Sequence, residues 1–157
     1  MSWAIDPAGQ ALTRFVRRLT ELRSKYPILH RSRFLTGEYN PELDVKDVTW
    51  INANGNEMQS EDWADTNTRC FGMLMDGRAQ VTGIRQRGHD ATLLMVLNAY
   101  HDLVRFTIPV SPGGDRWTRL IDTNFDDGAA EDVFKTGEQY DVTARSLLLF
   151  VLNAERS

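Results

Sequence analysis

Residues 92–108 read TLLMVLNAYHDLVRFTI, and this stretch decides the fold class. Its first six residues form a mainly apolar run of strand length. In the second run Val104, Phe106 and Ile108 alternate with Leu103, Arg105 and Thr107 at the two-residue period of a β-strand. A short polar segment separates the two runs. Pro109 ends the second run because proline has no backbone N–H to donate. The stretch is therefore typical of two short strands joined by a turn.

Similar short runs recur along the chain and are separated by turn signals. Asn54-Gly55 and Asp76-Gly77 are dipeptides that favour tight turns. Several short strands broken by such residues predict a mainly β fold, an antiparallel β-sandwich. The further expected strands are residues 48–51, 70–75, 117–121 and 146–152. The expected core positions are Val48, Trp50, Met73, Leu93, Leu94, Val96, Phe106, Ile108, Trp117, Leu147 and Leu149.

One amphipathic α-helix precedes the strands. Asp6 offers an N-cap acceptor, and Pro7 follows at the first helical position, where its missing N–H costs nothing. Pro27 ends the helix because the residue before a proline is disfavoured in the helical region. We expect two parts, a helical segment over residues 1–35 and a β-sandwich domain over residues 36–157. The apolar stripe of the helix consists of Leu12, Phe15, Val16, Leu19 and Leu22.

Composition and charge exclude several classes of protein. The chain of 157 residues has a net charge of −4, and the basic residues near its start suit a solvated helix face better than a nucleic-acid surface. The longest apolar run, residues 147–152, is far too short for a membrane-spanning helix. No signal peptide is visible, and the single Cys70, which we expect to be buried, cannot form an intrachain disulfide. We expect a cytoplasmic protein that binds neither nucleic acid nor membrane.

Clusters of carboxylates raise the question of hydrolysis, because paired acids cleave glycosidic bonds. Both clusters lie in polar, turn-like sequence without an apolar pocket that would raise the pKa of one acid. The segment 122–128 begins like a calcium loop but lacks the required Gly and Glu. We expect no catalytic residue, metal or cofactor here, and independent hydrolysis stays an alternative. The clusters are Glu61, Asp62 and Asp65, and Asp126, Asp127, Glu131 and Asp132.

Aromatic side chains are the other candidate functional groups, because sugar rings stack on exposed Trp and Tyr faces. The same side chains also suit core or sheet-edge packing, which is their usual place in a sandwich. Both interpretations stay open from the sequence. The candidate carbohydrate-binding residues are Trp50, Trp63, Tyr100 and Trp117, with Tyr39 as a further aromatic that could join them.

Two segments resemble those of known enzymes. Residues 22–35, LRSKYPILHRSRFL, resemble the segment that closes the catalytic barrel of α-amylase-family enzymes. Residues 47–63, DVTWINANGNEMQSEDW, carry most of the specificity and resemble the start of the C-terminal domain in bacterial glycogen debranching enzymes of the isoamylase type. Shorter matches continue in the same order over residues 74–77, 97–101, 106–109, 120–123 and 144–147.

The resemblance implies the C-terminal region of an α-amylase-family glycoside hydrolase that cleaves α-1,6 branch linkages in glycogen or limit dextrin with retention. The family's aspartate nucleophile, glutamate acid/base and stabilising aspartate sit on a (β/α)₈ barrel, and none of them has a matching position here. The implied partner is the enzyme's own barrel, and the implied role is structural. A carbohydrate-binding module that contacts α-glucan is the alternative, and an uncovered helix stripe would favour a homodimer.

Overall fold

The computed structural model describes residues 6–31, 34–79, 91–125 and 131–154. Within these residues, one long helix is followed by short strands and a few short helical turns. No helix in the described part of the chain is long and apolar enough to cross a membrane. The elements are α1 (Pro7–Lys25), η1 (Pro27–His30), β1 (Tyr39–Asn40), β2 (Val45–Lys46), β3 (Val48–Ile51), α2 (Ser60–Ala64), β4 (Cys70–Asp76), η2 (Gly77–Ala79), β5 (Thr92–Asn98), β6 (Val104–Thr107), β7 (Arg116–Asp122), β8 (Val133–Lys135), β9 (Gln139–Val142) and β10 (Ser146–Asn153).

Helix α1 begins and ends at the predicted signals. The Asp6 carboxylate accepts a hydrogen bond from the Gly9 amide at 2.7 Å, with Pro7 in the first turn. At the other end the Tyr26 amide donates to the carbonyl of Leu22 at 3.0 Å, and the next residue is a proline. The predicted helix is therefore confirmed.

Six strands form the main sheet in the order β3-β4-β5-β10-β7-β8, and neighbouring strands are antiparallel. Strand β10 lies between β5 and β7, where Leu148 pairs with Val96 on one side and with Asp122 on the other. The register toward β7 shifts between Leu149 and Phe150. Strand β10 is apolar along most of its length because both faces of the sheet are covered.

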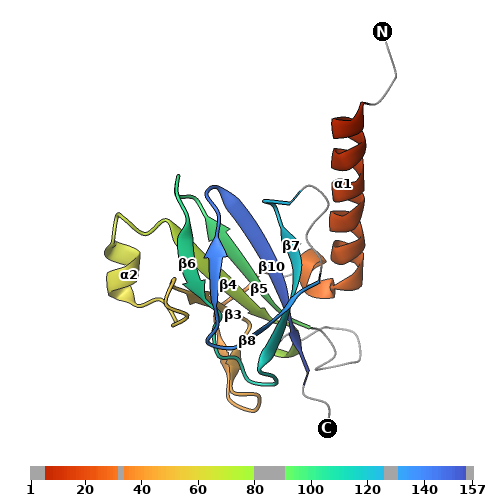
Figure 1. The fold of residues 1–157 in the computed structure, drawn as a ribbon. Helices are drawn as coiled ribbons and strands as arrows, with labels where there is room; N and C mark the ends of the chain where they lie inside the picture. The colour runs from red at the N-terminus through yellow and green to blue at the C-terminus, as the bar shows by residue number, and fades with distance from the viewer. Residues whose placement is uncertain (1–5, 32–33, 80–90, 126–130, 155–157) are drawn as a thin grey trace.

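The small sheet of β6 and β9 covers one face of the main sheet and makes the fold a sandwich (Figure 1). Between the layers lies a core that includes Phe106, Trp117 and Phe150, which are almost fully buried. Gly72 of β4 lets Phe106 approach, because a Cβ atom at this position would lie 2.9 Å from the Phe106 Cζ atom. The mainly β, antiparallel fold class is thus confirmed.

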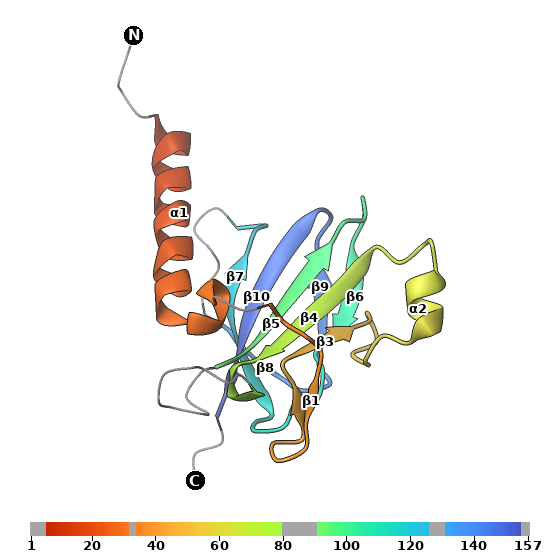
Figure 2. The same ribbon diagram turned by 180° about the vertical axis from the view of Figure 1, so that it is seen from behind.

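The opposite face of the main sheet is covered by η1 and by the C-terminal end of α1 (Figure 2). Leu22, Tyr26 and Ile28 are buried there in one cluster with Leu93 and Leu149. The N-terminal part of α1 projects beyond the sheet in both views (Figures 1 and 2). The helix is therefore anchored at one end and uncovered at the other.

The expected strands all form, as β3, β4, β5, β6, β7 and β10. Strands β1, β2, β8 and β9 and helix α2, each of five residues or fewer, were not predicted. Of the expected core residues, Trp50, Met73 and Leu147 are only partly buried. The others are buried: Val48, Leu93, Leu94, Val96, Phe106, Ile108, Trp117 and Leu149.

Candidate functional site

The distinctive segment 47–63 folds into edge strand β3, a tight loop and α2. The Asn52 side-chain oxygen accepts hydrogen bonds from the amides of Asn54 and Asn56 at 3.1 and 3.2 Å, which closes the loop. Gly55 has a φ of 83°, and a Cβ atom there would lie 2.9 Å from the backbone oxygen of Thr107. The loop therefore requires glycine both for its backbone conformation and for its close approach to β6.

Helix α2 is fixed by its own capping box. The backbone amide of Gln59 donates to the carboxylate of Asp62 at 2.8 Å, and the backbone amide of Asp62 donates in return to the Gln59 side chain. The side-chain amide of Asn52 also donates to Asp62, at 3.3 Å. These bonds connect α2 to the loop and fix the position from which Trp63 projects.

Trp63 packs against Trp50 and forms an aromatic corner. The ring centroids lie 5.8 Å apart with an interplanar angle of 80°, and Phe71 supports Trp50 from β4 at 5.8 Å. Trp50 is partly buried, whereas Trp63 is 59% exposed. The two indole planes are nearly perpendicular, and both rings line one depression at the surface.

A depression of about 370 Å³ lies beside this corner and is lined by both tryptophans. Lys46 and Glu57 also line it, with their Nζ and Oε1 atoms 2.6 Å apart, and both side chains are partly exposed. The Asp47 carboxylate accepts from the amide of Gly37 at 2.8 Å and so positions the segment that borders the depression. The remaining lining residues are Leu35, Thr36, Val48, Thr49, Met58 and Met73.

A second depression of about 340 Å³ shares Lys46, Thr49 and Glu57 with the first. Tyr39 and Asp44 lie on its rim, and the Tyr39 hydroxyl donates to the Asp44 carboxylate at 2.5 Å. This hydrogen bond raises the pKa of Tyr39, with smaller contributions from burial and from the charge of Asp44. Trp50 and Met73 line the first depression, whereas Ile51 and Leu74 line the second, so the two depressions lie on opposite faces of the sheet at its β3 edge. We call the first depression, which contains the aromatic corner and the Lys46–Glu57 pair, the edge groove.

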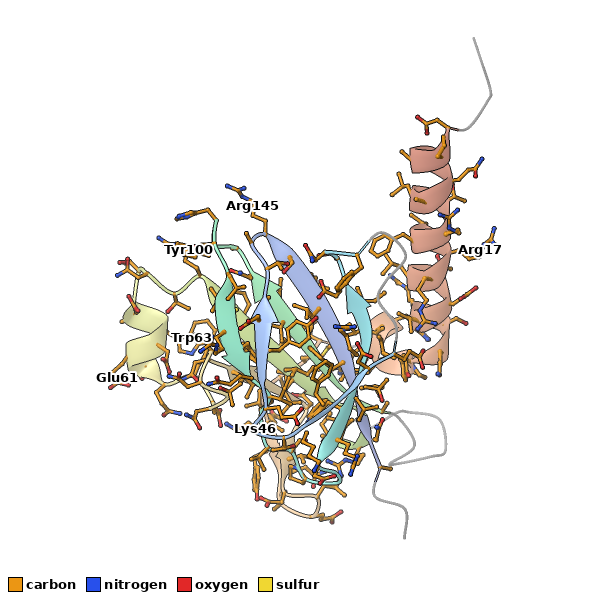
Figure 3. All side chains as sticks on the ribbon, viewed as in Figure 1. Arg17, Lys46, Glu61, Trp63, Tyr100 and Arg145 are labelled. Atoms are coloured by element: carbon orange, nitrogen blue, oxygen red, sulfur yellow. The ribbon has the colours of Figure 1, made fainter. Side chains whose placement is uncertain are left out.

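The structure separates the four predicted carbohydrate-binding residues. Trp50 and Trp63 meet at the edge groove, but Tyr100 packs on His101 with ring centroids 4.2 Å apart. Tyr100 lies in the turn where its carbonyl accepts from the Arg145 amide, away from the groove lining (Figure 3). Trp117 has no exposed surface, so its assignment as a sugar-binding residue was wrong, because it fills the core between the two sheets.

Lys46 and Glu57 were not among the predicted site residues, although both line the edge groove. Tyr39, which the sequence offered as a further aromatic, lines the second depression instead. Glu57 lies within the distinctive segment. The ion pair joins residues from β2 and from the loop after β3. Only the fold brings these two side chains together, and no local pattern in the sequence indicates the contact.

Most of the described acids of the two clusters make structural contacts, and Glu61 is exposed on α2. Asp62 caps α2, and the Asp65 carboxylate accepts from the amide of Asn67 at 2.8 Å. Glu131 pairs with Arg18 at 2.8 Å. Asp126 and Asp127 lie outside the described residues. Among the described residues, no group of three or more His, Cys, Asp and Glu side chains could hold a metal ion.

Asp132 belongs to a polar cluster at the side of the main core. Arg119 donates to the Asp132 carboxylate and to the Tyr140 hydroxyl, each at 2.6 Å, and the Tyr140 hydroxyl donates to Asp122 at 2.6 Å. Burial, followed by the hydrogen bond to Asp122, raises the pKa of Tyr140 to about 12. The cluster ties β7, β9 and the segment before β8 together, which is a structural role.

Fold and groove define an antiparallel β-sandwich domain whose exposed aromatic corner lies beside an ion pair. The family model described as "Isoamylase, C-terminal" matches residues 47–151. The chain belongs to this isoamylase C-terminal domain family. The match begins at the Asp47 that opens the distinctive segment, so the resemblance read from that segment is confirmed.

Named relatives cover nearly the whole chain. A glycogen operon protein GlgX homolog of Mycobacterium tuberculosis is 32% identical over 95% of this chain and 21% of its own length. An isoamylase of Pseudomonas amyloderamosa is 25% identical over 96% of this chain and 18% of its own length. The chain thus spans about a fifth of the length of these relatives.

One solved structure also aligns with the fold. It is an isomaltulose synthase mutant from Erwinia rhapontici NX5 in complex with D-glucose, with a TM-score of 0.44 and 15% sequence identity. The alignment covers 87% of this chain and 17% of the other.

Proposed function

We propose that this chain is the non-catalytic C-terminal domain of a glycogen debranching enzyme that hydrolyses α-1,6-glucosidic branch linkages. The family and the names of the relatives, a glycogen operon protein homolog and an isoamylase, support the enzyme class. The chain accounts for about a fifth of those relatives, which leaves ample length for a catalytic barrel. In this proposal the domain supports the barrel and contributes no reactive group.

The exposed apolar stripe of α1 is the observation that supports the proposed structural role. Leu22 is 3% exposed, whereas Leu12, Val16 and Leu19 on the same side of the helix are 63, 51 and 40% exposed. An apolar stripe that is continuous with a core residue is typical of a surface that another body covers. In the proposed enzyme this body is the barrel, packed along the projecting part of α1.

The full-length gene and its product test this proposal. We expect the reading frame upstream of codon 2 to encode a barrel with three catalytic acids. In the full-length enzyme, Val16→Glu should lower the unfolding temperature and the debranching rate because it places a charge in the apolar contact. Gln10→Glu, on the opposite side of α1, is the matched control and should change neither.

The isolated chain provides a direct assay of the non-catalytic role. We expect the purified 157-residue chain to release no reducing ends from a branched limit dextrin. Release that is lost in a Glu61→Gln variant would contradict the proposal, because a carboxylate of this chain would then do the chemistry.

The exposed Trp63 favours a second candidate function, α-glucan binding by the domain itself. An indole that is 59% exposed beside another tryptophan offers an apolar face that a sugar ring can cover. A titration with glycogen, followed by tryptophan fluorescence, distinguishes this function from a purely structural one, which predicts no shift.

A further inference from the structure

We propose that the edge groove binds a linear α-glucan segment. One glucose ring packs in the corner of Trp50 and Trp63, and the Lys46–Glu57 pair hydrogen-bonds to the hydroxyls of the neighbouring ring. The choice of α-linked glucose as the polymer rests on the proposed function. The site itself rests on the geometry of the groove.

The aromatic corner supplies the apolar part of such a site. A pyranose ring has an apolar face of C–H groups, and two indoles at 80° to each other can contact one face and one edge of the same ring. Both indoles line the first depression. The corner is also preformed, because Phe71 supports Trp50 and the capping box fixes α2, so little conformational entropy is lost on binding.

The ion pair supplies the polar part. Lys46 and Glu57 line the groove, and their side chains are 34 and 46% exposed, so their donor and acceptor atoms are accessible to a ligand there. Sugar hydroxyls donate and accept hydrogen bonds at once, which matches an ammonium beside a carboxylate.

The charge of the groove favours a neutral ligand. Its charged lining residues are Lys46 and Glu57, which pair with each other. A lining whose single cation is already paired does not suit phosphates and other anions, which are bound by clusters of Arg and Lys. The groove is an open depression at the edge of the sheet, so it suits part of a longer chain better than one enclosed small molecule.

The position of the groove keeps it free of the contacts that α1 makes. Strand β3 is the first strand of the main sheet, whereas the end of α1 packs near Leu120 and Ile121 of β7 toward the other edge. Figure 3 shows the labelled Trp63 and Arg17 on opposite sides of the molecule. A partner on the projecting part of α1 therefore leaves the edge groove accessible.

Titration of the 157-residue chain with maltoheptaose tests the proposal. We expect saturable binding by calorimetry, together with a blue shift in tryptophan fluorescence as a sugar ring covers Trp63. Trp63→Ala should weaken binding by about tenfold. Lys46→Met, which keeps the aliphatic stem but removes the donor, should weaken binding severalfold without changing the fold.

Tyr100→Ala is the matched control, because it removes an aromatic side chain outside the groove lining. It should bind like the wild type, and a β-1,4-linked glucan of similar length should bind more weakly than maltoheptaose. Absence of binding at millimolar maltoheptaose, unchanged affinity in Trp63→Ala, or a loss that follows Tyr100 would overturn the groove assignment. None of these outcomes contradicts the debranching-domain proposal. That proposal is tested separately, by the reading frame upstream and by the assay for released reducing ends.

Discussion

At the scale of single residues, burial changes how the chain responds to pH. Cys70 is 5% exposed at the start of β4, and burial raises the pKa of its thiol to about 12. The unfolded thiol ionises near its ordinary value of 9.0. Between these two values the unfolded chain loses a proton that the folded chain keeps, so the free energy of unfolding falls as pH rises.

Alkaline unfolding checks this coupling. We expect the free energy of unfolding, measured in urea, to be constant below about pH 9 and to fall above it by at most about 1.4 kcal/mol per pH unit from this thiol. In Cys70→Ala the decline should begin about one pH unit later, where Tyr140 contributes in the same direction. An identical pH profile in Cys70→Ala would show that the thiol is not responsible.

The residue type alone did not indicate which aromatic side chains are exposed and which are buried. Trp63 and Trp117 are both tryptophans in polar surroundings of the sequence, yet one is 59% exposed and the other fully buried. Trp117 is buried because the small sheet of β6 and β9, which pair only in the folded chain, covers its face of the main sheet. The segment 47–63 could be recognised from its residues, but the partnership of Lys46 with Glu57 depends on the folded loop.

At the scale of elements, α1 is one helix with two environments. Its C-terminal end shares a core with the sheet, and the predicted stripe continues into the uncovered part. Helices and strands with a clear period were predictable because several residues repeat the same signal. Strands β1, β2, β8 and β9 have two to four residues and form where longer-range pairing places them, so local sequence carries little information about them.

Substitutions of two leucines, one at the buried end of α1 and one in its uncovered part, test whether the two parts contribute differently to stability. We expect Leu22→Ala to lower the free energy of unfolding of the 157-residue chain by about 2–4 kcal/mol, because it leaves a cavity beside Leu93 and Leu149. Leu12→Ala, at a position that is 63% exposed, should change it by less than about 0.5 kcal/mol. Chemical denaturation of both variants measures the difference. Equal effects would show that the whole helix is one cooperative part of the sandwich core.

At the scale of the whole molecule, the sandwich presents two unlike surfaces. One edge of the sheet carries a preformed groove of mixed character, and the other side carries an amphipathic helix whose exposed apolar stripe projects into solvent. The first surface suits a hydrated, neutral ligand, whereas the second suits a large apolar partner. This division would let one small domain contact the proposed barrel and the proposed glucan ligand at the same time.

The projecting helix also predicts how the chain behaves without such a partner. Leu12, Val16 and Leu19 expose 40–63% of their surface, and a second copy can cover these side chains by packing its own stripe against them. We expect the sedimentation coefficient of the 157-residue chain to rise with concentration. Val16→Glu should keep the chain monomeric, because two carboxylates would meet in the apolar contact.

Gln10→Glu adds the same charge on the opposite side of α1, so it should associate like the wild type. A wild-type chain that stays monomeric at every concentration would contradict the prediction, and so would association that Val16→Glu leaves unchanged. The proposed barrel contact and the proposed self-association use the same stripe of α1, so they compete for one surface. Where the proposed barrel is present and covers α1, self-association through Leu12 and Val16 should therefore disappear.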